Sequence, residues 1–168
     1  MSTTTLVSVE EYLRRTGKPN CEYIDGVLYP KPMATTLHAL TQVTICPLMR
    51  SQGVYPLSEL TLRVRSEKFL VPDVAVAREI ELPYPARPVL LCIEILFPED
   101  RLGSTFAKCE DYHNWGVPYC WVIDPEKRTA WEYHKGGEPV HIDRGGALNT
   151  GELVLRLNEL FADFPSER

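Results

Sequence analysis

The stretch Val89-Leu90-Leu91-Cys92-Ile93-Glu94-Ile95-Leu96-Phe97 is the most apolar segment of the chain that can form a strand, and it carries a single charge. A continuous apolar run of this kind is typical of a strand that is covered on both faces. The carboxylate of Glu94 would lose its hydration there, at a cost of roughly several kcal/mol unless a cation or a metal ion compensates. Glu94 is therefore expected to have a cationic partner.

A second acid opens a similar strand. Asp73 lies near the start of the run Val71-Pro72-Asp73-Val74-Ala75-Val76-Ala77. Two carboxylates that project from two buried strands can bind a hard divalent cation through oxygen. Asp73 and Glu94 are therefore a candidate metal site.

The bulk composition is that of an ordinary globular protein. The chain has 168 residues, of which 44% are hydrophobic and 24% charged, so residues 1–168 are expected to form one domain with a sizeable core. The formal net charge is −5, which argues against a strongly basic nucleic-acid coat protein. It does not argue against a nuclease, because acids that are clustered for metal binding lower the total.

The sequence has no apolar stretch long enough to cross a bilayer and no recognisable secretory signal, so no membrane association is expected. The five cysteines are scattered and form no Cys-x-x-Cys pair, which predicts neither a zinc site nor a disulfide framework. A reducing cytoplasm is the simplest compartment for such a chain.

Hydrophobic periodicity, caps and turns predict an α/β fold in which helices flank a mixed sheet, rather than a regular βαβ repeat. An Asp-Gly turn predicts a hairpin at 21–29, and Pro47 predicts a kink or an early stop in the second helix. Helices are expected at 8–15, 36–50 and 104–115, with a helical turn at 157–161. Strands are expected at 61–65, 71–77, 89–97, 119–123, 129–134, 139–142 and 153–155.

The helix that follows the Glu94 strand supplies a cation. Lys108 and Tyr112 are four residues apart and share one face of the helix. The short connection from the strand is expected to fold this helix back on the sheet. Lys108 could then reach the carboxylates of Asp73 and Glu94. Two acids with a divalent cation, and an ammonium that orients a water molecule, are the groups that phosphodiester hydrolysis needs.

The ordered set of these motifs resembles the Uma family of putative restriction endonucleases, bacterial proteins with the PD-(D/E)xK nuclease fold. The resemblance extends over roughly Val7 to Tyr133. The block Gly116-Val117-Pro118-Tyr119-Cys120-Trp121-Val122-Ile123-Asp124-Pro125, after the lysine helix, is its most specific part. The other motifs are Glu22-Tyr23-Ile24-Asp25-Gly26, His38, Pro72-Asp73-Val74-Ala75-Val76, Ile93-Glu94-Ile95-Leu96 and Lys108-x-x-x-Tyr112.

The resemblance implies a restriction endonuclease-like fold, a mixed β-sheet flanked by helices. It also implies that the protein hydrolyses DNA with Mg²⁺ or Mn²⁺. It implies Asp73 and Glu94 as metal ligands and Lys108 as the active-site lysine. Glu22 corresponds to an additional acid from an early element. His38 matches a histidine that is frequent in the family, and its role stays open.

The chain departs from the usual nuclease motif at two positions. The lysine that ordinarily follows the glutamate by two residues on the same strand is replaced by Leu96, and the resemblance places it on the next helix as Lys108. The family's usual Ser-Pro after the glutamate strand is Phe97-Pro98 here, which affects a detail of the loop rather than the metal site.

Each candidate residue also has a purely structural interpretation. Glu94 could be a buried acid paired with an arginine, Asp73 a turn residue, Lys108 a solvated helix residue, Glu22 an exposed hairpin residue and His38 a packed core histidine. The alternative function is accordingly a non-catalytic homodimer that keeps the nuclease fold around an acid-lysine network. A hydrolase that acts on another phosphorylated substrate is a third hypothesis. A homodimer is expected. For the nuclease hypothesis, an acidic chain of this size would need a dimer, a partner or a metal to bind DNA tightly.

Overall fold

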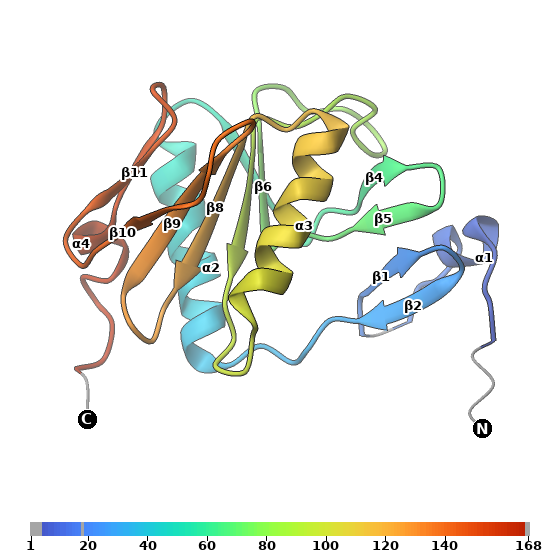
Figure 1. The fold of residues 1–168 in the computed structure, drawn as a ribbon, viewed down its shortest axis with the longest axis horizontal. Coiled ribbons are helices and arrows are strands. Elements are labelled where there is room, and N and C mark those ends of the chain that lie inside the picture. Colours follow the sequence, from blue (N-terminus) through green and yellow to red (C-terminus); the bar gives the residue numbers. More distant parts are fainter. Residues whose placement is uncertain (1–4, 18, 167–168) are drawn as a thin grey trace.

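A six-stranded mixed sheet lies at the centre of the computed structural model, which describes residues 5–17 and 19–166 (Figure 1). Its strand order is β10-β9-β8-β7-β6-β3, and only β7 and β8 run parallel to each other. The bounds are β3 Tyr55–Ser58, β6 Val74–Ala77, β7 Leu91–Ile95, β8 Tyr119–Asp124, β9 Thr129–His134 and β10 Val140–Ile142.

Two helices cover the two faces of this sheet. Helix α2 (Thr36–Arg50) packs on one face and helix α3 (Leu102–Trp115), which connects β7 to β8, packs on the other (Figure 1). Successive side chains of a strand point to opposite faces, so Ile93 joins the α2 core whereas Cys92 joins the α3 core. The same alternation turns Glu94 toward α3, the helix that carries Lys108.

A smaller sheet of four strands lies beside the central one, in the order β2-β1-β5-β4. The hairpin of β1 (Cys21–Ile24) and β2 (Val27–Pro30) turns at Asp25 and Gly26, whose φ angles of 48° and 88° suit a tight Asp-Gly turn. The strands β4 (Leu62–Arg65) and β5 (Lys68–Leu70) complete this sheet, and the short helix α1 (Val9–Leu13) packs on it through an aromatic cluster.

The remaining elements lie near the C-terminus. The strands β11 (Ala147–Asn149) and β12 (Val154–Arg156) form a two-stranded sheet, and α4 (Leu157–Leu160) packs in the same core as α2. Within the described ranges, no helix combines the length and the apolar character that a membrane span requires.

The predicted fold class is confirmed, and the differences concern single elements. Three short strands were not predicted, namely β3, β5 and β11. The early stop predicted at Pro47 is wrong, because α2 continues to Arg50. A proline in the last turn removes only the hydrogen bond to the carbonyl of Val43, and Val43 is 64% exposed, so water can take its place.

Candidate functional site

Glu94 is held at the α3 face of β7 by two donors that converge on one oxygen. The hydroxyl of Tyr112 donates a hydrogen bond of 2.7 Å to Oε1, and Nζ of Lys108 lies 2.9 Å from the same atom. Glu94 is only 7% exposed. The cationic partner of the buried glutamate is therefore a lysine from the helix, and not an arginine.

Lys108 also brings Glu22 into the site. Its Nζ lies 2.7 Å from Oε1 of Glu22, and that oxygen accepts a 2.9 Å hydrogen bond from the main-chain N–H of Val71. Glu22 thus belongs to the acid cluster instead of being an exposed hairpin residue. The antiparallel pairing of β1 with β5 carries Glu22 toward the segment at Val71, from which Asp73 follows.

Asp73 immediately precedes β6 and is 2% exposed. Its Oδ2 accepts a 2.7 Å hydrogen bond from the main-chain N–H of Ile95, which ties the carboxylate to the end of β7. Its Oδ1 accepts a 2.9 Å hydrogen bond from Nζ of Lys31. Among the described residues the ion-pair partners of Asp73 are Lys31 and His38, whereas Lys108 pairs with Glu22 and Glu94. The expectation that Lys108 reaches both Asp73 and Glu94 is met only for Glu94, because Lys31 is already seated at Asp73.

His38 faces this carboxylate from α2. Its Nε2 lies 3.3 Å from Oδ2 of Asp73, and its ring stacks on Phe97 with a centroid distance of 4.3 Å and an interplanar angle of 18°. Thr35 caps the start of α2 and accepts from the main-chain N–H of His38, which fixes the first turn of the helix. The phenylalanine at the position of the usual serine therefore packs against His38 and holds it on Asp73.

Three polar residues of the cluster were not predicted from the sequence. Lys31 contacts Asp73 and Glu59, and Nε2 of Gln42 donates to both the main-chain oxygen of Asp73 (2.7 Å) and Oε1 of Glu59 (3.2 Å). A signal for Gln42 was present, because it lies four residues after His38 on the same helix face. Nothing local identifies Lys31 or Glu59, whose partners are distant in sequence.

Charge and burial act against each other in this cluster. Burial disfavours ionisation of Asp73, but the adjacent His38 and the ammonium of Lys31 outweigh it and hold the pKa of Asp73 well below its usual range. Burial raises the pKa of Glu94, and the ammonium of Lys108 opposes that rise. Burial tends to lower the pKa of Lys108, but the charges of Glu94 and Glu22 reverse the effect and raise it. Two donors converge on Oε1 of Glu94, so we treat the pair as a carboxylate and an ammonium.

A protein-family model matches most of the chain. The model Uma2, described as "Putative restriction endonuclease", matches residues 9–162. The chain belongs to the Uma2 family. The resemblance seen in the sequence is thereby confirmed.

One solved structure shares the fold of this Uma2 domain. A crystal structure described as a putative nuclease belonging to DUF820 from Anabaena variabilis ATCC 29413 matches it with a TM-score of 0.77 and 23% identity, over 93% of this chain and 98% of that one. That similarity shows a shared nuclease fold. The cryo-EM structure of a DrdV–DNA complex matches with a TM-score of 0.45 and 19% identity, over 76% of this chain and 11% of that chain. No curated protein matches the chain.

The acid cluster of the Uma2 domain opens into a cavity of about 210 Å³. The predicted residues Glu22, Asp73, Glu94 and Lys108 all line it, together with Lys31. His38 lies behind Asp73 and does not line the cavity. A small ligand can therefore reach the carboxylates.

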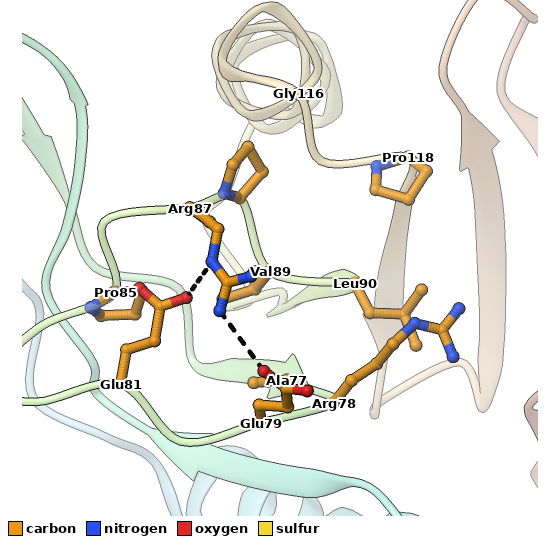
Figure 2. Close-up of a pocket in the computed structure, with 11 residues that line it drawn as sticks. Ala77, Arg78, Glu79, Glu81, Pro85, Arg87, Val89, Leu90, Gly116 and Pro118 are labelled. Atoms are coloured by element: carbon orange, nitrogen blue, oxygen red, sulfur yellow. Dashed lines mark hydrogen bonds and ion pairs between the residues drawn. The ribbon is translucent and has the colours of Figure 1, made fainter.

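A larger cavity lies away from the acid cluster. It measures about 400 Å³ and lies at the opposite end of β6, beyond Ala77, whereas Asp73 precedes that strand. Its most prominent cation, Arg87, is paired with Glu81 and Glu79 across the cavity wall (Figure 2). None of the predicted site residues lines it.

The donor set of the Uma2 site fits a hard divalent cation in part. The carboxylates of Asp73 and Glu94 are oxygen donors that line one cavity, and the described residues form no hydrogen bond to Oε2 of Glu94. Within 5–17 and 19–166, no group of three or more His, Cys, Asp or Glu side chains is placed to hold a metal ion. Mg²⁺ ordinarily takes only one or two carboxylates and completes its shell with water and substrate, so two ligands are sufficient.

Proposed function

We propose that the protein is a metal-dependent endonuclease that hydrolyses DNA phosphodiester bonds, with Asp73 and Glu94 as ligands for Mg²⁺ or Mn²⁺ and Lys108 as the residue that positions the attacking water. One observation carries the proposal. Two buried carboxylates from adjacent strands open into one cavity, and an ammonium from the covering helix touches one of them. The family description supports a nuclease, and DNA is the substrate that a restriction endonuclease cleaves.

The charge of the cluster supports a divalent ligand. Within residues 5–17 and 19–166, the carboxylates of Glu22, Glu59, Asp73 and Glu94 form ion pairs with two ammonium groups, those of Lys31 and Lys108. With every carboxylate ionised, the excess of negative charge equals the charge of one divalent cation. A divalent cation bound in the cavity would balance that excess of negative charge.

A divalent cation bound there would stabilise the negative charge that develops on the phosphate during hydrolysis. Lys108 has three N–H donors, and two of them are used by Glu22 and Glu94. Its contact with the main-chain oxygen of Val71 is long, at 3.5 Å, so the third donor can hold a water molecule in the cavity. Tyr112 and the main-chain N–H of Ile95 fix the two carboxylates in position.

The second candidate is a non-catalytic member of the family, for which the same cluster is a structural ion network. The observation that favours it is that Lys31 and Lys108 already give both metal-ligand carboxylates a cationic partner. A homodimer remains a proposal under both hypotheses.

A cleavage assay separates the two candidates. The wild-type chain and the Glu94→Gln variant are purified in parallel and incubated with plasmid DNA and Mg²⁺ or Mn²⁺, with EDTA as the metal-free control. The matched control variant is Glu152→Gln, which makes the same chemical change in an exposed ion pair with Arg78. We expect metal-dependent cleavage by the wild type and Glu152→Gln, and none by Glu94→Gln. Equal cleavage by all three proteins would indicate a contaminant and refute the proposal.

A further inference from the structure

Lys31 lies between two prolines directly after β2 and reaches into the acid cluster. Its Nζ lies 2.9 Å from Oδ1 of Asp73, 2.9 Å from the main-chain oxygen of Val71 and 3.3 Å from the carboxylate of Glu59. The side chain is 14% exposed. An ammonium has three N–H donors, and three acceptor groups surround this one, two carboxylates and a main-chain carbonyl, so its donors are all in use.

This environment is that of a bound hard cation. Two carboxylates and a main-chain carbonyl are the kinds of oxygen that bind divalent metal ions in proteins. Lys108 differs from Lys31, because its third contact is long and leaves a donor available. The two lysines therefore have different roles, and Lys31 has no donor left for a substrate phosphate.

The surroundings of Lys31 are built by other residues. Glu59 adopts a φ of 53°, a left-handed conformation that is strained for a residue other than glycine. Nε2 of Gln42 donates a 3.2 Å hydrogen bond to Oε1 of Glu59 and a 2.7 Å hydrogen bond to the main-chain oxygen of Asp73. Strain of this kind persists where the surrounding structure over-determines the conformation. Gln42 therefore helps to hold Glu59 and the Asp73 main chain beside Lys31.

We propose that Lys31 is a tethered counter-ion that occupies the cation position beside Asp73, so that a divalent metal ion must displace its ammonium to use Oδ1 as a ligand. The inference rests on the proposed function, since it concerns the same two-carboxylate site. In this arrangement the ammonium of Lys31 neutralises the buried Asp73 carboxylate. The inference also predicts that the lysine weakens metal binding.

The first test is calorimetric titration of the full chain with Mn²⁺. Lys31→Gln removes the charge and keeps a polar side chain, and Lys68→Gln is the matched control, because Lys68 is also a part-buried lysine paired with one acid, Asp111. We expect the Kd of Lys31→Gln for Mn²⁺ to be about tenfold lower than that of the wild type or lower still, and the Kd of Lys68→Gln to be unchanged. A Kd for Lys31→Gln that equals or exceeds that of the wild type would overturn the inference, as would an absence of binding in both.

A second measurement uses only the wild-type chain, in case the loss of Lys31 prevents folding. Lysines are labelled with an amine-reactive reagent at increasing Mn²⁺ concentrations, and the modified positions are quantified by mass spectrometry. Displacement of the ammonium should increase the labelling of Lys31 several-fold while that of Lys68 stays constant. If Lys31 remains protected at the highest Mn²⁺ concentration, the inference is wrong.

These results are distinguishable from failure of the proposed function. Tighter Mn²⁺ binding by Lys31→Gln without DNA cleavage by any variant would support the counter-ion and refute the nuclease. The opposite result is also possible: the wild type cleaves DNA with metal, Glu94→Gln does not, and wild type and Lys31→Gln bind Mn²⁺ equally. That result would support the nuclease and overturn the counter-ion.

Discussion

Replacement of Lys108 by methionine should destabilise the protein far more than replacement of Glu94 by glutamine. Methionine keeps much of the aliphatic volume of the lysine but leaves two carboxylates, Glu94 and Glu22, without the ammonium that contacts them at 2.9 and 2.7 Å. Removal of one partner of a buried ion pair costs about 3–5 kcal/mol. In a chain of this length 1 kcal/mol corresponds to about 2–4 °C in Tm, so Lys108→Met should lower the Tm by about 6–20 °C.

Glu94→Gln should be much milder. The amide oxygen can still accept from Tyr112, Lys108 keeps Glu22 as its counter-ion, and the cost of burying a charge at position 94 disappears. We expect a change of about 1 kcal/mol or less in the free energy of unfolding.

Equilibrium unfolding in urea, followed by circular dichroism in EDTA, measures both variants without a contribution from bound metal. The double variant Lys108→Met/Glu94→Leu is the control, since it replaces both charged groups by apolar ones and should recover part of the lost stability. A cost below about 1 kcal/mol for Lys108→Met, or equal costs for Lys108→Met and Glu94→Gln, would refute the reasoning that Lys108 is the counter-ion of a buried carboxylate.

Three further predictions address single contacts. Tyr112→Phe removes the 2.7 Å donor to the Glu94 carboxylate and should cost about 1.5–3 kcal/mol in urea unfolding, whereas a cost near zero would mean that the hydroxyl is replaced by water. Gly116→Ala should cost about 1–3 kcal/mol or more by the same measurement, because Gly116 has a φ of 122° and a Cβ there would lie 2.8 Å from Cγ of Pro88; a neutral substitution would contradict the model of that turn. Ser8→Ala removes the capping box of α1 and should cost about 1 kcal/mol, seen as faster hydrogen exchange of the Glu11 amide, and unchanged exchange would show that the cap does not hold the helix.

Much of the fold follows from local sequence. The apolar runs predicted the buried strands β7 and β8, and the periodicity between them predicted the helix α3 that connects them. The short strands β3, β5 and β11 could not be predicted in this way, because three or four residues carry too little periodicity. They are specified by pairing with strands that are already in place.

The site shows the same limit. The apolar runs around Asp73 and Glu94 singled out these two acids, and the helix face shared with Tyr112 indicated that Lys108 turns toward the sheet. The family resemblance added the roles expected of the three residues. Lys31 was not predicted, because a lysine between two prolines has the pattern of an exposed loop. Its partner Asp73 lies 42 residues away, and only the packing of the small sheet against the central one brings them together.

The central claim is that Asp73 and Glu94 bind one divalent cation with Lys108 beside it. A crystal soaked in Mn²⁺ and measured for anomalous scattering tests this most directly. We predict one peak in the cavity within coordination distance of both carboxylates, roughly 2.0–2.2 Å from their oxygens, with Nζ of Lys108 close to the ion's water ligands and Lys31 withdrawn from Asp73. Saturating Mn²⁺ with no peak at these carboxylates, or with a peak elsewhere only, would contradict the claim.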